Sequence, residues 1–355
     1  MNTLTRKLPL NKSLMNKTPY RGNAIPPLPA APKSRHRAMQ TLMGFGSYAG
    51  LDPNTMQQED ADTVQYAEAQ DKEFYKKDWW WDHQRIRFLN DGGMIKLFLF
   101  IIPGIIWFLF NGTILFTTIN LFETYRLPIA VFFLLLILFF FIFMESVIFS
   151  FPLIFNGFFK FFEILSKPFH KQVEAGLDRA LEKKCSEFNR TDGMVRLAIS
   201  AKEKFEAPFI EFDPYIESVV QSGGVYYRLV HRYTGKTFTK INLTGLSATQ
   251  HEVFALWDML QRFMDVTQPL PDMPRLEPFR HLDPLTAEHD RSTGRHPRFW
   301  RDLDLKAWGD NEGAERAKAQ RAFEWNKLKC QLTPLLGRIS MEEYRVTFPN
   351  HHDER

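Results

Sequence analysis

The chain has 355 residues, and its 45 Lys and Arg residues outnumber its 41 Asp and Glu residues by only four. An excess this small does not by itself indicate a nucleic-acid-binding protein. The two cysteines, Cys185 and Cys330, lie in different segments without metal-ligand spacing, which argues against a disulfide framework or a zinc site. The mean hydropathy of −0.28 is that of a soluble protein, although the apolar residues are concentrated between residues 97 and 162.

Residues 1–40 form a basic, proline-containing segment that we expect to be a flexible arm. The segment holds eight Lys or Arg residues and no Asp or Glu, and residues 25–32 read as a polyproline-type stretch. The basic start is followed by no apolar run, so we expect no cleavable signal peptide. Its composition is consistent with two roles: an arm attracted to an anionic membrane surface, or a solvated tail.

Residues 41–96 are polar and are expected to form a cytoplasmic juxtamembrane region. Near its end stand three consecutive tryptophans, Trp79, Trp80 and Trp81. Three adjacent residues cannot all face one core from a helix, and indole rings are enriched at membrane–water interfaces. The sequence therefore predicts a membrane-interface role for these three side chains, with a small soluble cluster as the alternative.

Two long apolar runs predict a pair of transmembrane helices. Residues 97–119 contain no charged residue and are long enough to cross a bilayer core. A short periplasmic loop is expected at 120–127, and a second helix at 128–155. Both outer flanks are rich in Lys and Arg whereas the loop has only Arg126, so the positive-inside rule predicts a bacterial inner-membrane, multi-pass protein with both termini cytoplasmic.

Residues 156–190 are expected to form an interfacial, charged helix, and 191–355 a cytoplasmic α+β domain. Two β-rich runs around a Thr-Gly turn predict a hairpin over residues 225–243. Ser247, with Gln250 three residues later, resembles a capping box at the start of an amphipathic helix. The apolar residues of that helix share one face, and they are Val253, Leu256, Trp257, Leu260, Phe263 and Met264. A last helix is expected at about 312–332.

Glu145 and Asn111 are polar residues inside the apolar runs. A carboxylate at membrane depth is costly unless it is paired or protonated, so Glu145 marks either a partner-binding or ion-sensing site or the true end of the second helix. Asn111, with Gly112 and Thr113, forms a small polar patch that could face another helix.

No known catalytic or cofactor-binding motif is found, so we expect no enzyme, no cofactor and no metal. The spacing of His281, Asp283, His289, Asp290 and His296 matches no compact ligand set and favours a surface loop. Arg298 and Arg301 flank Phe299 and Trp300; this pattern could stack on nucleic acid but more often serves a protein interface or the edge of a core.

Three segments carry a resemblance to a known family: HRYTGKTF at 231–238, ALWDMLQRFMDV at 255–266 and PRFWRDLD at 297–304. In this order, after a two-helix hairpin, they resemble an uncharacterised family of bacterial two-helix membrane proteins. Its members carry a C-terminal domain of unknown function and are often encoded beside type VI secretion effectors. The resemblance covers roughly residues 70–310. The turn at Tyr233, Thr234 and Gly235 departs from the basic turn of the family.

The resemblance implies a non-enzymatic inner-membrane protein that binds a protein partner, as an immunity or accessory protein for a type VI effector. An envelope or secretion-system scaffold and a membrane-inserting effector are the alternatives. We expect contact with the lipid bilayer but with no nucleic acid and no small-molecule substrate. The residues expected to contact the partner are Glu145, Asn111, Trp257, Arg262, Phe299 and Trp300.

Overall fold

The computed structural model describes residues 18–32, 40–77, 80–89, 93–125, 128–131, 133–135, 137–141, 143, 145, 154–157, 160, 181–200, 202–219, 224–238 and 249–347. The chain divides into two compact units. Unit 1 comprises residues 1–90 and 183–355, and unit 2 comprises residues 91–182. Unit 1 is therefore built from both ends of the chain, whereas the sequence predicted a globular domain from its C-terminal part alone.

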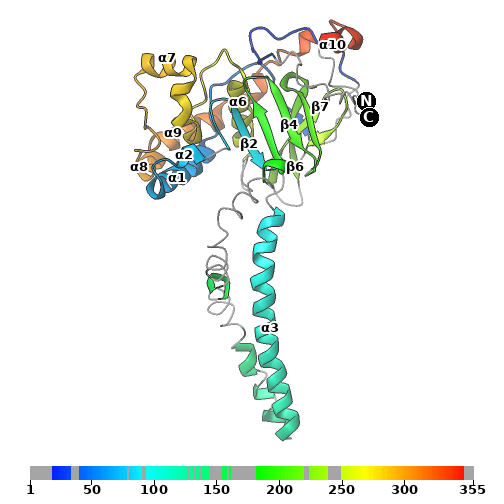
Figure 1. Ribbon diagram of the computed structural model, residues 1–355, viewed down its shortest axis with the longest axis vertical. Coiled ribbons are helices and arrows are strands. Elements are labelled where there is room, and N and C mark those ends of the chain that lie inside the picture. Colours follow the sequence, from blue (N-terminus) through cyan, green and yellow to red (C-terminus); the bar gives the residue numbers. More distant parts are fainter. Residues whose placement is uncertain are drawn as a thin grey trace, which may run out of the picture. The chain divides into compact units, whose positions relative to one another are not determined.

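Unit 1 contains two antiparallel four-stranded sheets (Figure 1). One has the order β1-β6-β7-β8 and the other the order β2-β3-β4-β5. The strands of the first are Gln40–Leu42, Phe212–Val219, Gly224–His231 and Thr237–Phe238 in that order. The strands of the second are Arg85–Leu89, Cys185–Asn189, Met194–Ala198 and Lys204–Pro208.

The chain leaves unit 1 after β2 and returns to it at β3. These two strands pair antiparallel, with Leu89 opposite Cys185 and Arg85 opposite Asn189. Unit 2 is thus inserted between neighbouring strands of one sheet. Residues 185–189 were predicted to end a charged helix; they form β3 because Cys185 and Phe188 are buried by the sheet.

A hairpin forms where the β-rich runs predict one. The strand β7 pairs antiparallel with β8, and Leu229 lies opposite Phe238. The turn between them contains Gly235 at φ 68°, a left-handed conformation that glycine adopts without steric cost. β8 covers the start of the predicted second run, and residues 239–243 of that run lie outside the described residues.

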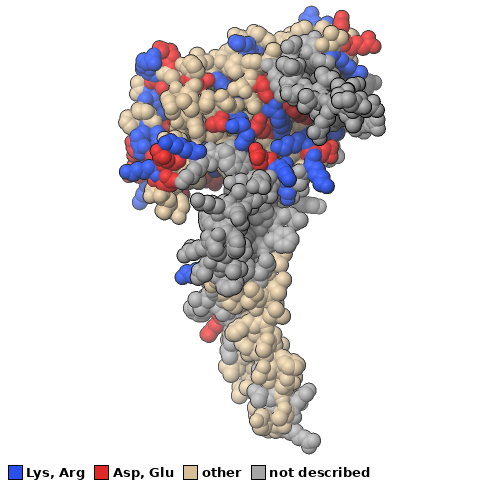
Figure 2. Space-filling model, viewed as in Figure 1, with Lys and Arg blue, Asp and Glu red and all other residues tan. Residues whose placement is uncertain are grey.

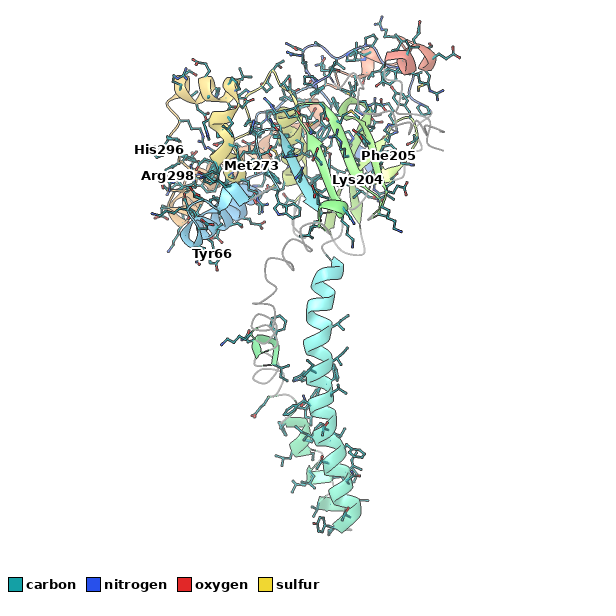
Figure 3. All side chains as sticks on the ribbon, viewed as in Figure 1. Tyr66, Lys204, Phe205, Met273, His296 and Arg298 are labelled. Atoms are coloured by element: carbon teal, nitrogen blue, oxygen red, sulfur yellow. The ribbon has the colours of Figure 1, made fainter. Side chains whose placement is uncertain are left out.

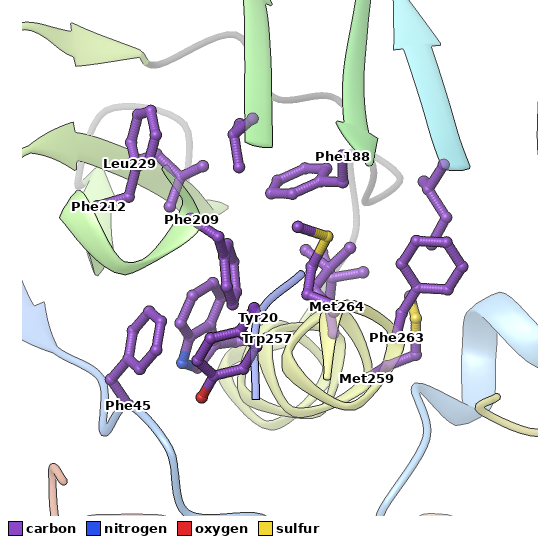
Figure 4. Packing of buried hydrophobic residues seen from close by; sticks show 14 of the residues in the cluster. Tyr20, Phe45, Phe188, Phe209, Phe212, Leu229, Trp257, Met259, Phe263 and Met264 are labelled. Atoms are coloured by element: carbon purple, nitrogen blue, oxygen red, sulfur yellow. The ribbon is translucent and has the colours of Figure 1, made fainter. Parts of the chain in front are cut away.

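Helix α6 (Gln250–Met264) packs its apolar face into the core of unit 1 (Figure 4). The helix is capped by Thr249, whose side chain accepts a hydrogen bond from the Glu252 amide, rather than by Ser247, which lies outside the described residues. All six predicted face residues are buried. They belong to one core cluster with aromatic side chains of both sheets, including Phe188 and Phe212.

A group of helices forms the remaining part of unit 1. The α-helices are α1 (Asn54–Gln70), α2 (Phe74–Lys77), α7 (Pro284–Thr293), α8 (Leu305–Asp310), α9 (Glu312–Ala322) and α10 (Met341–Thr347). The 3-10 helices are η2 (Phe209–Glu211), η3 (Pro274–Leu282), η4 (Trp325–Lys327) and η5 (Thr333–Leu335). A second apolar cluster of Ala61, Trp300 and Trp308 lies among them. The helix predicted at 312–332 ends ten residues early, at Ala322.

The N-terminal segment is part of the core. Tyr20 and Leu28, which the sequence placed in a flexible arm, are buried. Leu28 donates a backbone hydrogen bond to Leu335 and accepts one from Gly337, so these two segments, far apart in the sequence, lie side by side. The described residues 18–32 are ordered because their apolar side chains are removed from water and their backbone groups are paired.

A buried polar cluster holds α10 against the first sheet. The Tyr344 hydroxyl donates to Glu211 Oε1 at 2.7 Å, and His231 Nε2 lies 2.7 Å from Glu211 Oε2. The Thr234 amide donates to His231 Nδ1, so that nitrogen is an acceptor and the proton of a neutral ring is on Nε2. All three buried side chains are thereby hydrogen-bonded, as buried polar groups require.

Unit 2 contains helix α3, from Gly93 to Tyr125, 33 residues long. The helix continues through most of the loop predicted at 120–127. Across the helices that the structure describes, none combines the length and apolar content that a membrane crossing needs.

This finding contradicts the transmembrane helices predicted at 97–119 and 128–155. The membrane hairpin, the multi-pass inner-membrane localisation and the cytoplasmic placement of both termini were wrong with them. The prediction rested on the length of two uncharged runs, whereas a crossing needs a helix that is both long enough and apolar enough, a combination that no helix in the described part of the chain reaches. The fold class is therefore α+β, with two sheets and several helices and without that hairpin.

Candidate partner-binding surface

Helix α3 exposes a continuous stripe of apolar side chains, which we name the α3 stripe. Most of its members are three, four, seven or eleven residues apart and so share one face of the helix, and Ile106 and Phe110 beside that face are exposed as well. The exposed fractions are 54% for Ile105, 65% for Phe108, 66% for Leu109, 65% for Phe116 and 36% for Ile119. Figure 3 shows side chains projecting outward along α3, and in Figure 2 the described surface of this helix is almost without charged residues.

The opposite face of α3 is packed within unit 2. Trp107 is buried, and its ring centroid lies 5.1 Å from that of Phe143. Asn111, one helical turn further on, is only 2% exposed, and its side chain donates to the Trp107 carbonyl at 2.9 Å. The structure thus places Asn111 on the packed face, away from the α3 stripe, with its amide bonded to its own helix.

Gly112 makes a notch in the α3 stripe. It is exposed, and a Cβ added to it would meet no atom within 4 Å. The neighbouring hydroxyl of Thr113 donates to the Leu109 carbonyl at 2.8 Å and so leaves no polar group unpaired on this side chain. Because the distance between packed helices is set by the side chains at their contact, a glycine here permits a close approach.

Glu145 is an exposed helical residue of unit 2. Residues 146–150, which follow it, lie outside the described residues. An exposed carboxylate is solvated and needs no buried counter-charge. Its predicted role as a partner contact stays a prediction.

Trp257 is a core residue of unit 1. Its ring is 2% exposed and lies 5.4 Å from Phe209, and its Nε1 donates to the Gly44 carbonyl at 2.6 Å. The side chain joins α6 to the segment before α1. Trp257 therefore makes a structural contact within the core, and its ring is not exposed at the surface.

Arg262 connects the end of α6 to the loop before α1. Its guanidinium bonds Asp52 Oδ1 at 2.5 Å and Asp258 Oδ2 at 3.0 Å. Asp258 also accepts hydrogen bonds from the amides of Ala49, Gly50 and Leu51. Burial raises the pKa of Asp258 above its usual value, against the lowering effect of the Arg262 charge.

Phe299 and Trp300 belong to the helical part of unit 1. Trp300 is fully buried, contacts Trp308 at 5.2 Å and donates from Nε1 to Asp272 Oδ1 at 3.0 Å. Phe299 is half-buried, with the Arg295 guanidinium 5.6 Å from its ring centroid. The structure therefore brings Arg262, Phe299 and Trp300 into one region of unit 1, around Asp272 and Arg295.

The arginines next to these aromatics are paired with carboxylates. Arg298, labelled with His296 in Figure 3, bonds both oxygens of Glu68 at 2.9 and 3.0 Å. Arg301 bonds Glu277 Oε1 at 2.9 Å. Such pairing satisfies the guanidinium groups within the fold, as expected at the edge of a core.

The three tryptophans predicted at a membrane interface are described only in part. Trp79 lies outside the described residues. Trp81 is buried in the core of unit 1, with the Arg275 guanidinium 5.7 Å from its ring centroid, and Trp80 packs against the same core. The arrangement of Trp80 and Trp81 is that of the soluble cluster, the alternative that the sequence left open.

The histidine- and aspartate-containing segment before residue 297 forms helix α7 and its flanks. Asp283 caps α7 by accepting from the Thr286 amide at 3.0 Å, and Asp290 pairs with Arg280. Among the described residues no group of three His, Cys, Asp or Glu side chains could hold a metal ion. The acidic residues of this segment are thus explained by capping and ion pairing.

Searches with the sequence and the fold found no matching family model, no matching curated protein and no matching solved structure. The resemblance to bacterial two-helix proteins encoded beside type VI effectors stays a prediction.

Proposed function

We propose that the protein is a non-enzymatic binding protein that docks an apolar helix of a protein partner on the α3 stripe. The observation that carries the proposal is the exposure of Ile105, Phe108, Leu109, Phe116 and Ile119 on one helix face. A contiguous exposed apolar surface of this kind marks an interaction site. Burial of side chains such as Phe108 and Leu109 stabilises a complex by roughly 1.5–3 kcal/mol each, before the cost of association.

The shape of the surface favours a helix as the docked element. Its apolar side chains follow one helical face, and Gly112 leaves open space within it. A second helix can place its own side chains between those of α3, as ridges fit into grooves. Recognition of an amphipathic helix by an apolar surface is a recurrent mode of binding.

The identity of the partner rests on the family resemblance alone. On that basis we propose a type VI secretion effector, which the protein would neutralise or accompany. The second candidate is a secretion-system scaffold, in which the same stripe docks a component of the apparatus. A toxin-like open reading frame beside the gene favours the first of these.

Site-specific photo-crosslinking tests the proposal in cells that co-express the protein and the effector candidate encoded beside it. Benzoylphenylalanine at Phe108 or Phe116 should form a covalent product with that effector. The matched control is the same residue at Trp107, which lies one position from Phe108 but on the packed face. Growth of the cells with and without the protein measures neutralisation.

Products from Phe108 and Phe116 but not from Trp107 support docking on the α3 stripe. A product with a second copy of this chain assigns the stripe to self-association instead, which contradicts the proposal. Equal products from all three positions, or none from the stripe, also contradict it. Crosslinking without growth rescue favours the scaffold.

A further inference from the structure

We propose that unit 1 binds phosphate, free or as the monoester of a small hydroxylated molecule, in an arginine-lined cleft. The cleft has a volume of about 410 Å³. Its walls come from α1, the end of α6, the segment before η3, α7 and α9. The residues that carry the argument are Gln57, Arg262, Asp272, His289 and Arg316. This inference is independent of the α3 stripe, which belongs to unit 2.

The lining is cationic. Four arginines, Arg262, Arg280, Arg295 and Arg316, stand against two aspartates, Asp52 and Asp272. With His289 neutral, the lining residues themselves therefore carry a formal charge of +2, and four further carboxylates that pair with these arginines, Asp258, Glu277, Asp290 and Glu312, lie outside the lining. Arginine is the residue best suited to oxyanions because its planar donors match the geometry of phosphate and carboxylate oxygens.

Two of the arginines build the cleft. Arg280 bonds both carboxylate oxygens of Asp290 and donates to the carbonyls of Leu270 and Pro271 at 2.9 Å each. Arg295 bonds Asp272 and Glu277 at 2.7 and 3.1 Å. Their donors are mostly used within the wall, so these side chains supply rigidity.

The other two arginines keep donors available. Arg262 uses Nε and one Nη for Asp258 and Asp52, and among the described residues its Nη1 makes no hydrogen bond. Arg316 uses Nε and Nη2 for Glu312, and its Nη1 lies 4.0 Å from the nearest carboxylate oxygen, Asp272 Oδ2. Each guanidinium can therefore donate to a ligand oxygen without giving up a present bond.

A buried acceptor narrows the choice of anion. Gln57 is 1% exposed, and its Nε2 donates to the Asp272 carbonyl at 2.8 Å, which fixes the orientation of the amide. Its Oε1 has no hydrogen-bond donor within the described part of the chain. A buried acceptor without a donor is costly, so the ligand should bring an O–H group as well as negative oxygens.

Hydrogen phosphate meets both requirements at neutral pH, since it carries negative oxygens and a hydroxyl. A phosphate monoester meets them if its organic part carries a hydroxyl. Sulfate and an ionised carboxylate carry no O–H donor near pH 7, and either would leave Gln57 Oε1 unpaired. The cleft volume, within the usual range for small-molecule sites, leaves room for the monoester.

Titration calorimetry of the full chain at pH 7 and low ionic strength tests the proposal with inorganic phosphate, glycerol 3-phosphate, sulfate and glycerol. We expect phosphate or glycerol 3-phosphate to bind, sulfate to bind at least about tenfold more weakly, and glycerol not to bind. Arg316→Gln should weaken phosphate binding about tenfold or more. The matched control is Arg321→Gln, which removes an exposed charge from the same helix outside the cleft and should have no effect.

Gln57→Leu removes the buried acceptor and should abolish the preference for phosphate over sulfate. Tighter binding of glycerol 3-phosphate than of phosphate identifies a monoester site, and the reverse order identifies a free-phosphate site. Absence of binding by either in the wild-type chain overturns the proposal, as does equal affinity for sulfate. Equal losses of phosphate affinity in Arg316→Gln and Arg321→Gln would mean that general positive charge causes the binding, and this result would also overturn the proposal. Thermal melts confirm that each variant is folded.

Discussion

Gly193 allows the N-terminal segment to lie against the turn between β3 and β4. Its φ is +69°, and a Cβ built on it would stand 2.6 Å from the Thr18 carbonyl oxygen and 3.1 Å from the Tyr20 amide nitrogen. Both neighbours are backbone atoms, so neither can move aside as a flexible side chain could. Gly193→Ala should therefore either distort the turn or displace the segment that carries Tyr20 into the core.

The magnitude follows from comparison with Gly294, the αL residue that ends α7 at φ +67°. An added Cβ there meets nothing within 4 Å, so Gly294→Ala has only the left-handed backbone penalty of about 1–2 kcal/mol. Gly193→Ala has the same penalty plus the clash, which displaces Tyr20 from its buried site. Loss of that aromatic packing adds about 2 kcal/mol or more.

Guanidinium-induced unfolding followed by tryptophan fluorescence measures both variants. Gly193→Ala should lose at least about 3 kcal/mol of unfolding free energy and Gly294→Ala about 1–2 kcal/mol. Limited proteolysis should also cut the Gly193→Ala chain faster near residues 18–32. Equal losses in the two variants would refute the reasoning, because the backbone penalty would then account for both.

Two further predictions concern single contacts of unit 1. Trp257→Phe should destabilise the fold by about 1–3 kcal/mol in the same unfolding assay, because it leaves the Gly44 carbonyl without its 2.6 Å donor. Little or no loss would mean that water replaces the indole. Burial alone would raise the pKa of Glu187, but hydrogen bonds from Asn189 and Arg87 and the charge of Arg196 lower it. The stabilisation from Glu187 is therefore present above its ordinary pKa of 4.5 and lost as the pH falls through the lowered value, so Glu187→Gln should flatten the acid limb of a stability–pH curve, unlike the exposed control Glu315→Gln.

Local sequence pattern was sufficient to predict an element where its buried residues form a single, continuous apolar face. The six apolar positions of α6 predicted both the helix and its buried side, because period 3.6 places them together whatever they pack against. The Thr-Gly turn likewise predicted the β7–β8 hairpin, since only the turn chemistry and the flanking β-rich runs are needed. The end of α9 was predicted wrongly because residues with helix propensity continue past Ala322. There the burial of Trp325 determines the backbone conformation instead of local propensity.

The residues of the candidate sites also divide into those that the sequence pattern selects and those that only the fold brings together. Arg262 and Trp300 were selected from the sequence as partner contacts, but their environment depends on Asp52 and Asp272, which are far away in the chain. Arg316, the proposed phosphate donor, looks like any exposed arginine of a charged helix. Nothing in its neighbourhood of the sequence signals the cleft, because the cleft is assembled from five separate segments.

The sequence by itself determined the apolar character of residues 97–162, the β7–β8 hairpin, the buried face of α6 and the small net charge. These features depend only on composition and short-range periodicity. Only the tertiary structure decided that residues 18–32 belong to the core, that β2 and β3 pair although unit 2 separates them in the sequence, and which faces of α3 are packed or exposed. Each of these rests on contacts between residues distant in sequence, whose pairing is set by the burial of the whole apolar surface and leaves no mark on any one segment.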